Sequence, residues 1–395
     1  MFRKYKLLPL WPDNNAFFNP CLPPALPAKL ANHEVIISAF EGIDLEQVWD
    51  THVHLIGTGD TNSGIWLHPS LRNPFRFWRY LQFHFYLNAS CPLAKMPLDV
   101  GFIERLKRLH WGQGSRLVLL ALDYTYNEQG QKLPEKSAFY TPNHYVAQIH
   151  KQNPELFEWF ASVHPYRQDC VEALEQASAD GAKGIKWLPP AMGMNPASPL
   201  CDRFYATLAR LNLPLLCHCG AENAIGGADT QAFGNPLALR RALDQGVKVI
   251  IAHCASLGSN PDIDKGQHGT VRSNFEFFTR LMEESRYEGY LFGDISALPQ
   301  VNRIEPALTT LIMRQDWHSR LLNGSDYPLP GVLPLFSLKL LTEKGFISKT
   351  QADVLSQLRQ HNALLFDFVL KRHLQVKGQH FDKAVFHTRR HFNYF

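Results

Sequence analysis

Eight short apolar segments recur along the chain, and their alternation with helix-like stretches is the feature that most restricts how it can fold. Each segment is rich in aliphatic and aromatic residues and shorter than an ordinary helix. The segments cover residues 47–55, 116–123, 157–164, 182–188, 213–218, 247–253, 289–295 and 321–326. Patterns with helical spacing lie between several of them, for example at 167–179 and 236–244.

This alternation predicts βαβ units, because parallel strands need a crossover connection that is usually a helix. Eight such units predict a closed (β/α)8 barrel of the α/β class, a TIM barrel. We expect a single barrel domain over residues 46–375, with an N-terminal arm at 1–45 and a C-terminal tail at 376–395. The arm is rich in proline and is expected to be irregular.

The connection between the first two predicted strands, residues 56–115, is unusually long. It contains the aromatic-rich stretch FRFWRYLQFHFYLN. Three alternatives stay open for this stretch: a helix packed on the barrel rim, a lid that contacts substrate, or a subunit interface of a homo-oligomer. Near the other end of the chain, residues 349–373 are strongly helical, and we expect them to close the barrel against its first helix.

Composition and charge argue against several classes of protein. A hydrophobic fraction of 45%, a charged fraction of 19% and a net charge of +4 are ordinary for a soluble enzyme. Basic residues of the tail accompany no nucleic-acid-binding module, so no nucleic-acid partner is expected. No window has the roughly 18 apolar residues of a membrane span. Pro9 and Pro12 interrupt the short apolar run after the basic start, so we expect no signal peptide and a cytoplasmic protein without a membrane partner.

The cysteines are scattered rather than paired in a recognisable framework. There are seven, at positions 21, 91, 170, 201, 217, 219 and 254, and no two form a CxxC motif. This pattern fits a reducing compartment, where a disulfide framework is not expected.

Polar residues collect at the C-terminal ends of the predicted strands. His52 and His54 alternate with Thr51 and Val53, so a strand would place both imidazoles on one face, where they can bind the same metal ion. Four further residues stand at or near other strand ends: Lys186, His218, His253 and Asp326. All strand C-termini of a parallel barrel converge on one face. A lone histidine in a strand is often a hydrogen-bonded core residue. That interpretation would have to hold independently at each of these strand ends, so the set as a whole favours a metal site.

The ordered set of motifs resembles the amidohydrolase superfamily, especially its metal-dependent branch related to aminocarboxymuconate-semialdehyde decarboxylase. The matching segments are WDTHVHL, SVHPYR, GAKGIKWLPP, LLCHCG, VIIAHCAS, LFGDIS and LLNGSDYP, spread over about residues 48–328, and the closing segment HNALLFDF. The resemblance does not extend to the arm, the long first loop or the tail.

By this resemblance, His52, His54, His218 and Asp326 are the expected ligands of a divalent ion, with zinc as the first choice and one or two ions bound. Asp326 would orient a water molecule and accept its proton. His253 would be either a ligand of a second ion or a hydrogen-bond donor to the developing oxyanion. Lys186 would be a carboxylated bridging ligand of a two-metal site, a free cation for a substrate carboxylate, or a side chain paired away from the metal.

Other candidates have weaker support. Cys217, Cys219 and Cys254 are out of phase with the neighbouring histidines and are expected to be core thiols. Asp50 is in phase with the HxH pair and is expected to support a ligand rather than bind the metal. Contact with a small-molecule substrate is expected from four residues: His164, Arg167, Asp294 and His268.

The predicted reaction is hydrolysis of an amide, lactone or ester by a metal-activated water. The first alternative is a metal-dependent non-oxidative decarboxylase or other lyase acting on a small carboxylic acid, because fold and metal do not determine chemistry. A non-catalytic barrel is a further alternative, disfavoured because all the expected ligands are present.

Overall fold

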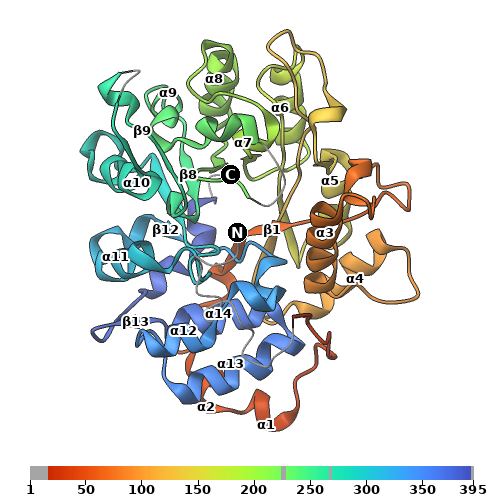
Figure 1. Ribbon diagram of the computed structural model, residues 1–395, viewed down its shortest axis with the longest axis vertical. Coiled ribbons are helices and arrows are strands. Elements are labelled where there is room, and N and C mark those ends of the chain that lie inside the picture. The colour runs from red at the N-terminus through yellow and green to blue at the C-terminus, as the bar shows by residue number, and fades with distance from the viewer. Residues whose placement is uncertain (1–16, 224–227, 267–268, 393–395) are drawn as a thin grey trace.

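The central feature of the computed structural model is a barrel of eight parallel strands inside a ring of helices (Figure 1). The structure describes residues 17–223, 228–266 and 269–392. The barrel strands are β1 (Trp49–His54), β3 (Arg116–Leu120), β5 (Phe157–Phe160), β6 (Ile185–Trp187), β7 (Leu215–His218), β8 (Val249–Ala252), β11 (Leu291–Asp294) and β12 (Leu321–Leu322). Each lies within one of the predicted segments, so the strand prediction is confirmed.

Two seams close the barrel. The strands form two sheets in the orders β1-β3-β5 and β12-β11-β8-β7-β6. At one seam Ala161 pairs with Ile185, and the backbone N–H of Lys186 donates to the Ala161 carbonyl at 2.7 Å. At the other seam Val53 pairs with Tyr327, and the His54 N–H donates to the Tyr327 carbonyl at 3.0 Å. The predicted TIM barrel is therefore the fold of this chain.

Helices between successive strands cover the outside of the barrel. They are α5 (Asn143–Gln152), α6 (Cys170–Ala179), α7 (Pro189–Met192), α8 (Asp202–Leu211), α9 (Arg240–Leu243), α10 (Asn274–Glu283) and α11 (Thr309–Met313). After β12 come α12 (Leu338–Glu343), α13 (Lys349–His361) and α14 (Ala363–His373). The prediction that residues 349–373 are helical is confirmed, with a break at Asn362. The extended backbone of Asn362 ends α13, and its side chain accepts from the Leu365 N–H to cap α14.

The tail is part of the barrel packing rather than an appendage. Phe392 lies inside the barrel, where its ring stacks on Trp49 at 5.7 Å between centroids and contacts Phe160. The Thr388 hydroxyl accepts from the Trp49 N–H and donates to the Trp49 carbonyl. Phe392 thus completes the apolar cluster that the side chains of the barrel strands form inside the barrel.

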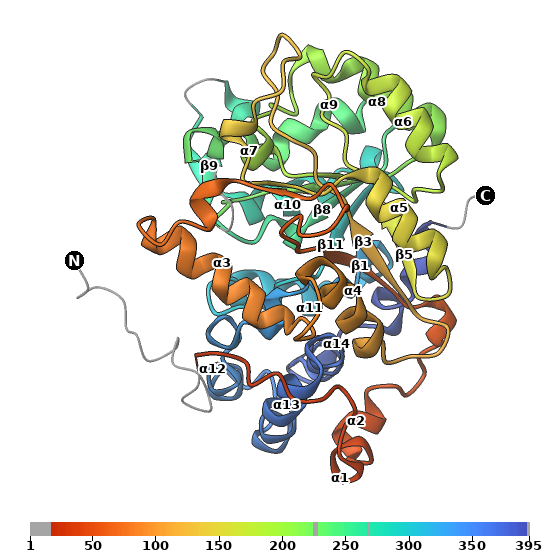
Figure 2. The ribbon, with the colours of Figure 1, turned by 90° about the vertical axis from the view of Figure 1, so that its right-hand side faces the viewer.

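The arm contains two short helices, α1 (Ala28–Ala31) and α2 (Glu34–Ser38), which lie beside α13 in both views (Figures 1 and 2). A disulfide joins Cys21 to Cys91, which corrects the expectation of reduced cysteines only. The two positions are 70 residues apart, so only the tertiary structure brings them together. This bond removes the support that the cysteine pattern gave to a reducing compartment.

The long first connection folds over the barrel mouth. It contains α3 (Phe77–Ser90) and α4 (Leu98–Leu109), and β2 (Trp66–Leu67) pairs with β4 (Phe139–Tyr140). Two further small ladders join β9 (Ser259–Pro261) to β10 (Val271–Ser273) and β13 (Gln375–Val376) to β14 (Gln379–His380). Within the described ranges, no helix combines the length and the apolar character needed to cross a membrane.

Candidate metal centre

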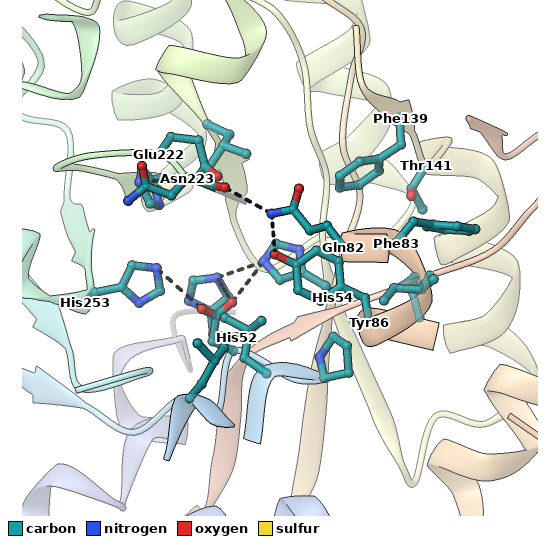
Figure 3. A pocket seen from close by; sticks show the side chains of 18 of the residues that line it. His52, His54, Gln82, Phe83, Tyr86, Phe139, Thr141, Glu222, Asn223 and His253 are labelled. Carbon is teal, nitrogen blue, oxygen red and sulfur yellow. Dashed lines mark hydrogen bonds and ion pairs between the residues drawn. The ribbon is translucent and has the colours of Figure 1, made fainter. Parts of the chain in front are cut away.

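A cavity of about 290 Å³ opens at the C-terminal ends of the barrel strands. Side chains from β1, β6, β7, the turn after β8 and the segment after β12 form its floor, and α3 contributes to its wall. Gln82 of α3 spans the cavity to donate a hydrogen bond to the Asn223 carbonyl at 3.1 Å (Figure 3). The aromatic-rich stretch is therefore a helix, α3, whose Gln82 and Tyr86 line the cavity.

His52 and His54 lie side by side on the cavity floor (Figure 3), and Asp326 lines the same cavity. The two Nε2 atoms of the histidines lie 3.2 Å apart, and Oδ1 of Asp326 lies 3.2 Å from Nε2 of His54 and 3.5 Å from Nε2 of His52. On the other side of the carboxylate, Oδ2 lies 3.7 Å from Nε2 of His253. Donor atoms of His52, His253 and Asp326 all lie within 4.8 Å of one another, a spacing that a single metal ion can bridge.

Local backbone conformations aim these side chains inward. His253 and Asp326 both have positive φ angles, 55° and 58°, which are uncommon for residues with a Cβ atom and concentrate at functional sites. Gly324 permits the approach of β12 to β1, because a Cβ atom there would lie 2.8 Å from Cβ of His52. The turns that end β8 and β12 are thus shaped around the histidine cluster.

Asp294 and Ser296 orient the imidazoles of His52 and His253 through hydrogen bonds to their Nδ1 atoms. Asp294 Oδ2 accepts from Nδ1 of His52 at 2.8 Å, while Asp294 Oδ1 accepts the backbone N–H of His253 at 2.9 Å. The Ser296 hydroxyl donates to Asp294, so its oxygen is available to accept from Nδ1 of His253 at 2.8 Å. With both Nδ1 atoms protonated in this way, Nε2 of His52 and of His253 carries the lone pair that a metal needs.

Lys186 is completely buried, and its Nζ donates to Nε2 of His52 at 2.9 Å. Among the residues that the structure places, no carboxylate forms an ion pair with it, so the pairing of Lys186 away from the metal is not what is observed. A metal on Nε2 of His52 would compete directly with this ammonium. Lys186 must then move, lose its proton or be modified.

His218 presents a buried ring nitrogen, Nε2, that makes no hydrogen bond in the described parts of the chain. It lies 3.5 Å from Oε2 of Glu222, and its ring contacts that of His253 at 5.3 Å. A buried polar atom without a partner is costly, and a cation would satisfy it, so the donor set of this site fits a divalent metal.

The charge states agree with this fit. Burial is the main reason that the pKa of His54 falls to about 4 and that of His253 to about 3. Burial likewise holds the pKa of His218 well below its usual value and lowers that of Lys186. Burial would raise the pKa of Asp326, but the neighbouring His52 and His253 outweigh it and keep the pKa low. The low pKa values of His54, His218, His253 and Asp326 favour the deprotonated forms that metal binding requires.

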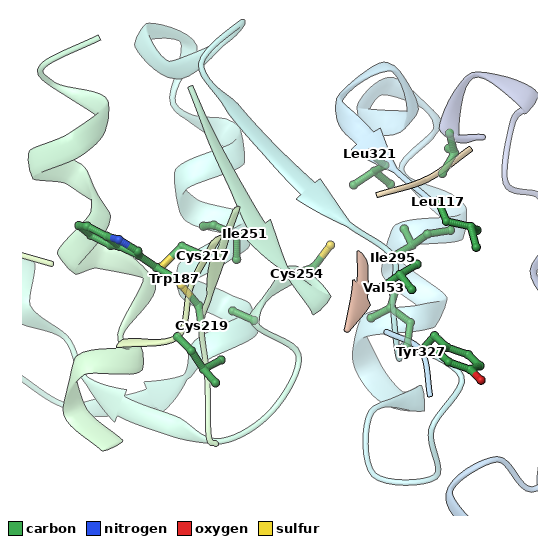
Figure 4. Close-up of a cluster of buried hydrophobic side chains, with 14 of the residues drawn as sticks. Val53, Leu117, Trp187, Cys217, Cys219, Ile251, Cys254, Ile295, Leu321 and Tyr327 are labelled. Carbon is green, nitrogen blue, oxygen red and sulfur yellow. The ribbon is translucent and has the colours of Figure 1, made fainter. Parts of the chain in front are cut away.

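The three cysteines beside the histidines lie outside this cluster. Cys217, Cys219 and Cys254 are buried in the apolar layer between the strands and the helices (Figure 4), as the strand alternation predicted. Asp50 supports the site from below, because its Oδ1 accepts the backbone N–H groups of His52 and Ser325.

The residues expected to contact substrate lie elsewhere. Asp294 does not line the cavity and accepts a hydrogen bond from His52 instead. The expectation that it contacts substrate is therefore wrong, and its role is to orient His52. His164 is buried, with its Nε2 donating to the Met192 carbonyl and its Nδ1 accepting the Tyr166 N–H, which leaves its ring nothing to offer a ligand. Arg167 pairs with Asp123 and Asp169 at a separate surface depression. His268 lies outside the described residues.

Loops supply cavity residues that strand-end reasoning did not identify. Glu222 lies in the loop after β7, four residues after His218. Gln82 and Tyr86 come from the helix α3. Gln300 and Arg303 lie in the segment after β11. The sequence contains no signal for these residues, since loop residues have no periodicity that reports the direction of their side chains.

The chain matches one protein family and is similar to several solved structures. A family model described as amidohydrolase matches residues 128–364, more than half of the chain. An uncharacterized TIM-barrel protein from Bordetella bronchiseptica is 13% identical, with a TM-score of 0.46 over 79% of this chain and 99% of that chain. A probable 2-pyrone-4,6-dicarboxylic acid hydrolase from Acinetobacter baumannii is 15% identical, with a TM-score of 0.43 over 78% of this chain and 95% of that one. A 2,6-dihydroxybenzoate decarboxylase is 11% identical, with a TM-score of 0.39 over 81% and 98% of the two chains. No curated protein matches.

Proposed function

This chain belongs to the amidohydrolase family, and on that premise we propose that it is a metal-dependent hydrolase that cleaves an amide, lactone or ester bond of a small molecule. One observation carries the proposal: His52, His54, His253 and Asp326 converge on the cavity floor beside Nε2 of His218, which makes no hydrogen bond in the described parts of the chain. His52, His54, His218 and Asp326 would hold the ion, with zinc as the preferred metal because three imidazoles and a carboxylate suit it.

The bound ion would act as a Lewis acid that lowers the pKa of water and polarises the substrate carbonyl. Asp326 would accept the proton of the attacking water and return it to the leaving nitrogen or oxygen, because its ionised carboxylate faces the same cavity as the histidines. His253 is better suited to bind a cation than to donate to an oxyanion, since its Nδ1 proton is engaged by Ser296.

The state of Lys186 decides between one and two ions. Carboxylation would turn the cation that now contacts Nε2 of His52 into an anionic ligand able to bridge two metals. A single ion would instead require the Lys186 amine to be displaced or neutral, which its burial favours. Metal content per chain, measured by elemental analysis on protein purified without chelator, distinguishes these alternatives.

A decarboxylase is the second candidate, and the two cationic side chains that line the cavity, Lys186 and Arg303, favour it. The test uses zinc-loaded protein and a panel of lactones, amides, esters and small carboxylic acids. Release of acid from a lactone, amide or ester, measured by pH-stat titration and abolished in His54→Ala, supports the hydrolase. Release of CO2 from the acids without uptake of water would refute hydrolysis and establish the lyase.

A further inference from the structure

Three exposed aromatic side chains lie within residues 75–78, at the start of α3. Phe75 is 95% exposed, Trp78 73% and Phe77 58%, and the rings of Phe77 and Trp78 lie 5.3 Å apart between centroids. Apolar side chains that are exposed one at a time are common on proteins, whereas adjacent exposed aromatic residues indicate an interaction site. We refer to Phe75, Phe77 and Trp78 as the aromatic tip.

Hydrogen bonds hold the aromatic tip in a defined turn. The Asn73 side chain accepts the N–H of Phe75 at 2.9 Å, and the Asn73 carbonyl accepts the N–H of Arg76 at 2.9 Å. From this turn α3 runs along the wall of the cavity, which Gln82 and Tyr86 line. Figure 2 shows α3 at the left of the molecule, with the loop before it projecting outward. The aromatic tip is therefore presented to its surroundings beside the cavity rather than packed against the barrel.

The chain around the aromatic tip carries positive charge only. Arg72, Arg76 and Arg79 alternate with the aromatic residues and are all exposed. Arg72 donates to a backbone carbonyl and Arg79 to a serine hydroxyl, and none of the three pairs with a carboxylate in the part of the chain that the structure describes. Residues 61–98 contain no aspartate or glutamate, although the whole chain has 36 acidic residues against 40 basic ones. The aromatic tip thus combines apolar rings with unpaired positive charge.

A membrane surface that contains anionic lipids fits both properties. Aromatic rings enter the boundary between headgroups and acyl chains, while lysine and arginine on the polar side attract anionic headgroups. A second copy of the chain fits less well, because a two-fold interface would place the arginines of one tip against those of the other. Residues 1–16 carry three basic residues and one acidic residue, so they do not complement the charge of the tip either.

We propose that the aromatic tip and its three arginines dock the cavity side of the barrel on a membrane that contains anionic lipids. The chain is then a peripheral membrane protein, which replaces the expectation that it has no membrane partner. The proposal is independent of the reaction at the metal centre. Docking through the start of α3 places the helix that lines the cavity next to the lipid headgroups.

The test is co-sedimentation of the full chain with two kinds of vesicle: phosphatidylcholine alone, and phosphatidylcholine mixed with phosphatidylserine. The unaltered protein should bind the mixed vesicles, and added salt should weaken this binding because it screens the arginines. Phe75→Ser should lower the partition coefficient about 10-fold, because it removes apolar surface that enters the lipid. Arg76→Gln should lower it about fivefold, the contribution of one basic residue beside an anionic surface.

Val271 and Arg272 provide a matched control away from α3. Val271 is 62% exposed, and Arg272 pairs with Glu276 at 3.3 Å, so an exposed apolar residue here stands beside an arginine whose charge is already paired. Val271→Ser and Arg272→Gln should bind the mixed vesicles like the unaltered protein. A loss of binding in these variants as large as that in the tip variants would overturn the assignment to the aromatic tip.

Three further results would overturn the proposal: no binding to the mixed vesicles, equal binding to both kinds of vesicle, or binding that Phe75→Ser and Arg76→Gln leave unchanged. Analytical ultracentrifugation tests the second copy as the partner. A dimer that Trp78→Ser dissociates, in a protein that does not bind vesicles, would assign the aromatic tip to self-association and refute membrane docking.

Discussion

Replacing Asp294 with asparagine should weaken metal binding although Asp294 itself would not touch the metal. Oδ1 of Asp294 accepts from the His253 and Ser296 N–H groups, and an asparagine oxygen can take over these bonds. The amide nitrogen would then replace Oδ2 and present a donor to Nδ1 of His52, 2.8 Å away. His52 can accept that donor only if its proton moves to Nε2, the atom that the metal requires.

The expected loss follows from the cost of disturbing a residue that supports a metal ligand. Such substitutions lower metal affinity by about 10- to 100-fold, or about 1.4–2.7 kcal/mol. The assay is zinc titration against a competing fluorescent chelator, with urea unfolding to confirm that the variant folds. Asp123→Asn is the matched control, because Asp123 is equally buried at a strand end but pairs with Arg167 away from the cluster. The tautomer argument would be refuted if Asp294→Asn bound zinc with an affinity within about twofold of that of the unaltered protein, because this change is much smaller than the expected loss.

Three further predictions concern other parts of the molecule. Lys186→Ala should bind one zinc per chain and lose any dependence of activity on bicarbonate; a second zinc retained in this variant would exclude a carboxylated bridge. Burial lowers the pKa of His164 from 6.5 to about 3. Between these two pH values the unfolded chain binds a proton that the folded protein does not, so the free energy of unfolding should fall as the pH drops from 6.5 to about 3. The slope contributed by His164 is at most about 1.4 kcal/mol per pH unit and should be missing in His164→Gln; equal slopes in urea titrations would contradict this origin. Reduction of the disulfide between Cys21 and Cys91, which closes a loop of 70 residues, should lower the free energy of unfolding by about 4 kcal/mol, and no change with dithiothreitol would show that the bond does not form in the protein.

The barrel and the position of the candidate metal centre were predictable because both depend on local periodicity. Side chains alternate along a strand, so His52 and His54 had to share a face wherever β1 lay. Parallel strands end on the same side, so His218, His253 and Asp326 had to approach one another once the barrel was recognised. The helical pattern of residues 349–373 was likewise readable from the sequence, whereas the break at Asn362 is visible only in the backbone turn and the cap that separate α13 from α14.

The sequence by itself determined the fold class, the order of the strands and the histidine, lysine and aspartate residues that meet at their ends. The tertiary structure alone decided which residues surround that cluster. Asp294 belongs to a predicted strand end, yet whether it faces a substrate or His52 depends on a contact across 242 residues of chain. Arg303, Gln300 and Gln82 reach the cavity from loops and from α3, where no repeat in the sequence fixes the direction of a side chain. Periodic elements have directions that can be read from spacing, whereas loops and long-range pairs such as Cys21 and Cys91 take theirs from the packing of the whole chain.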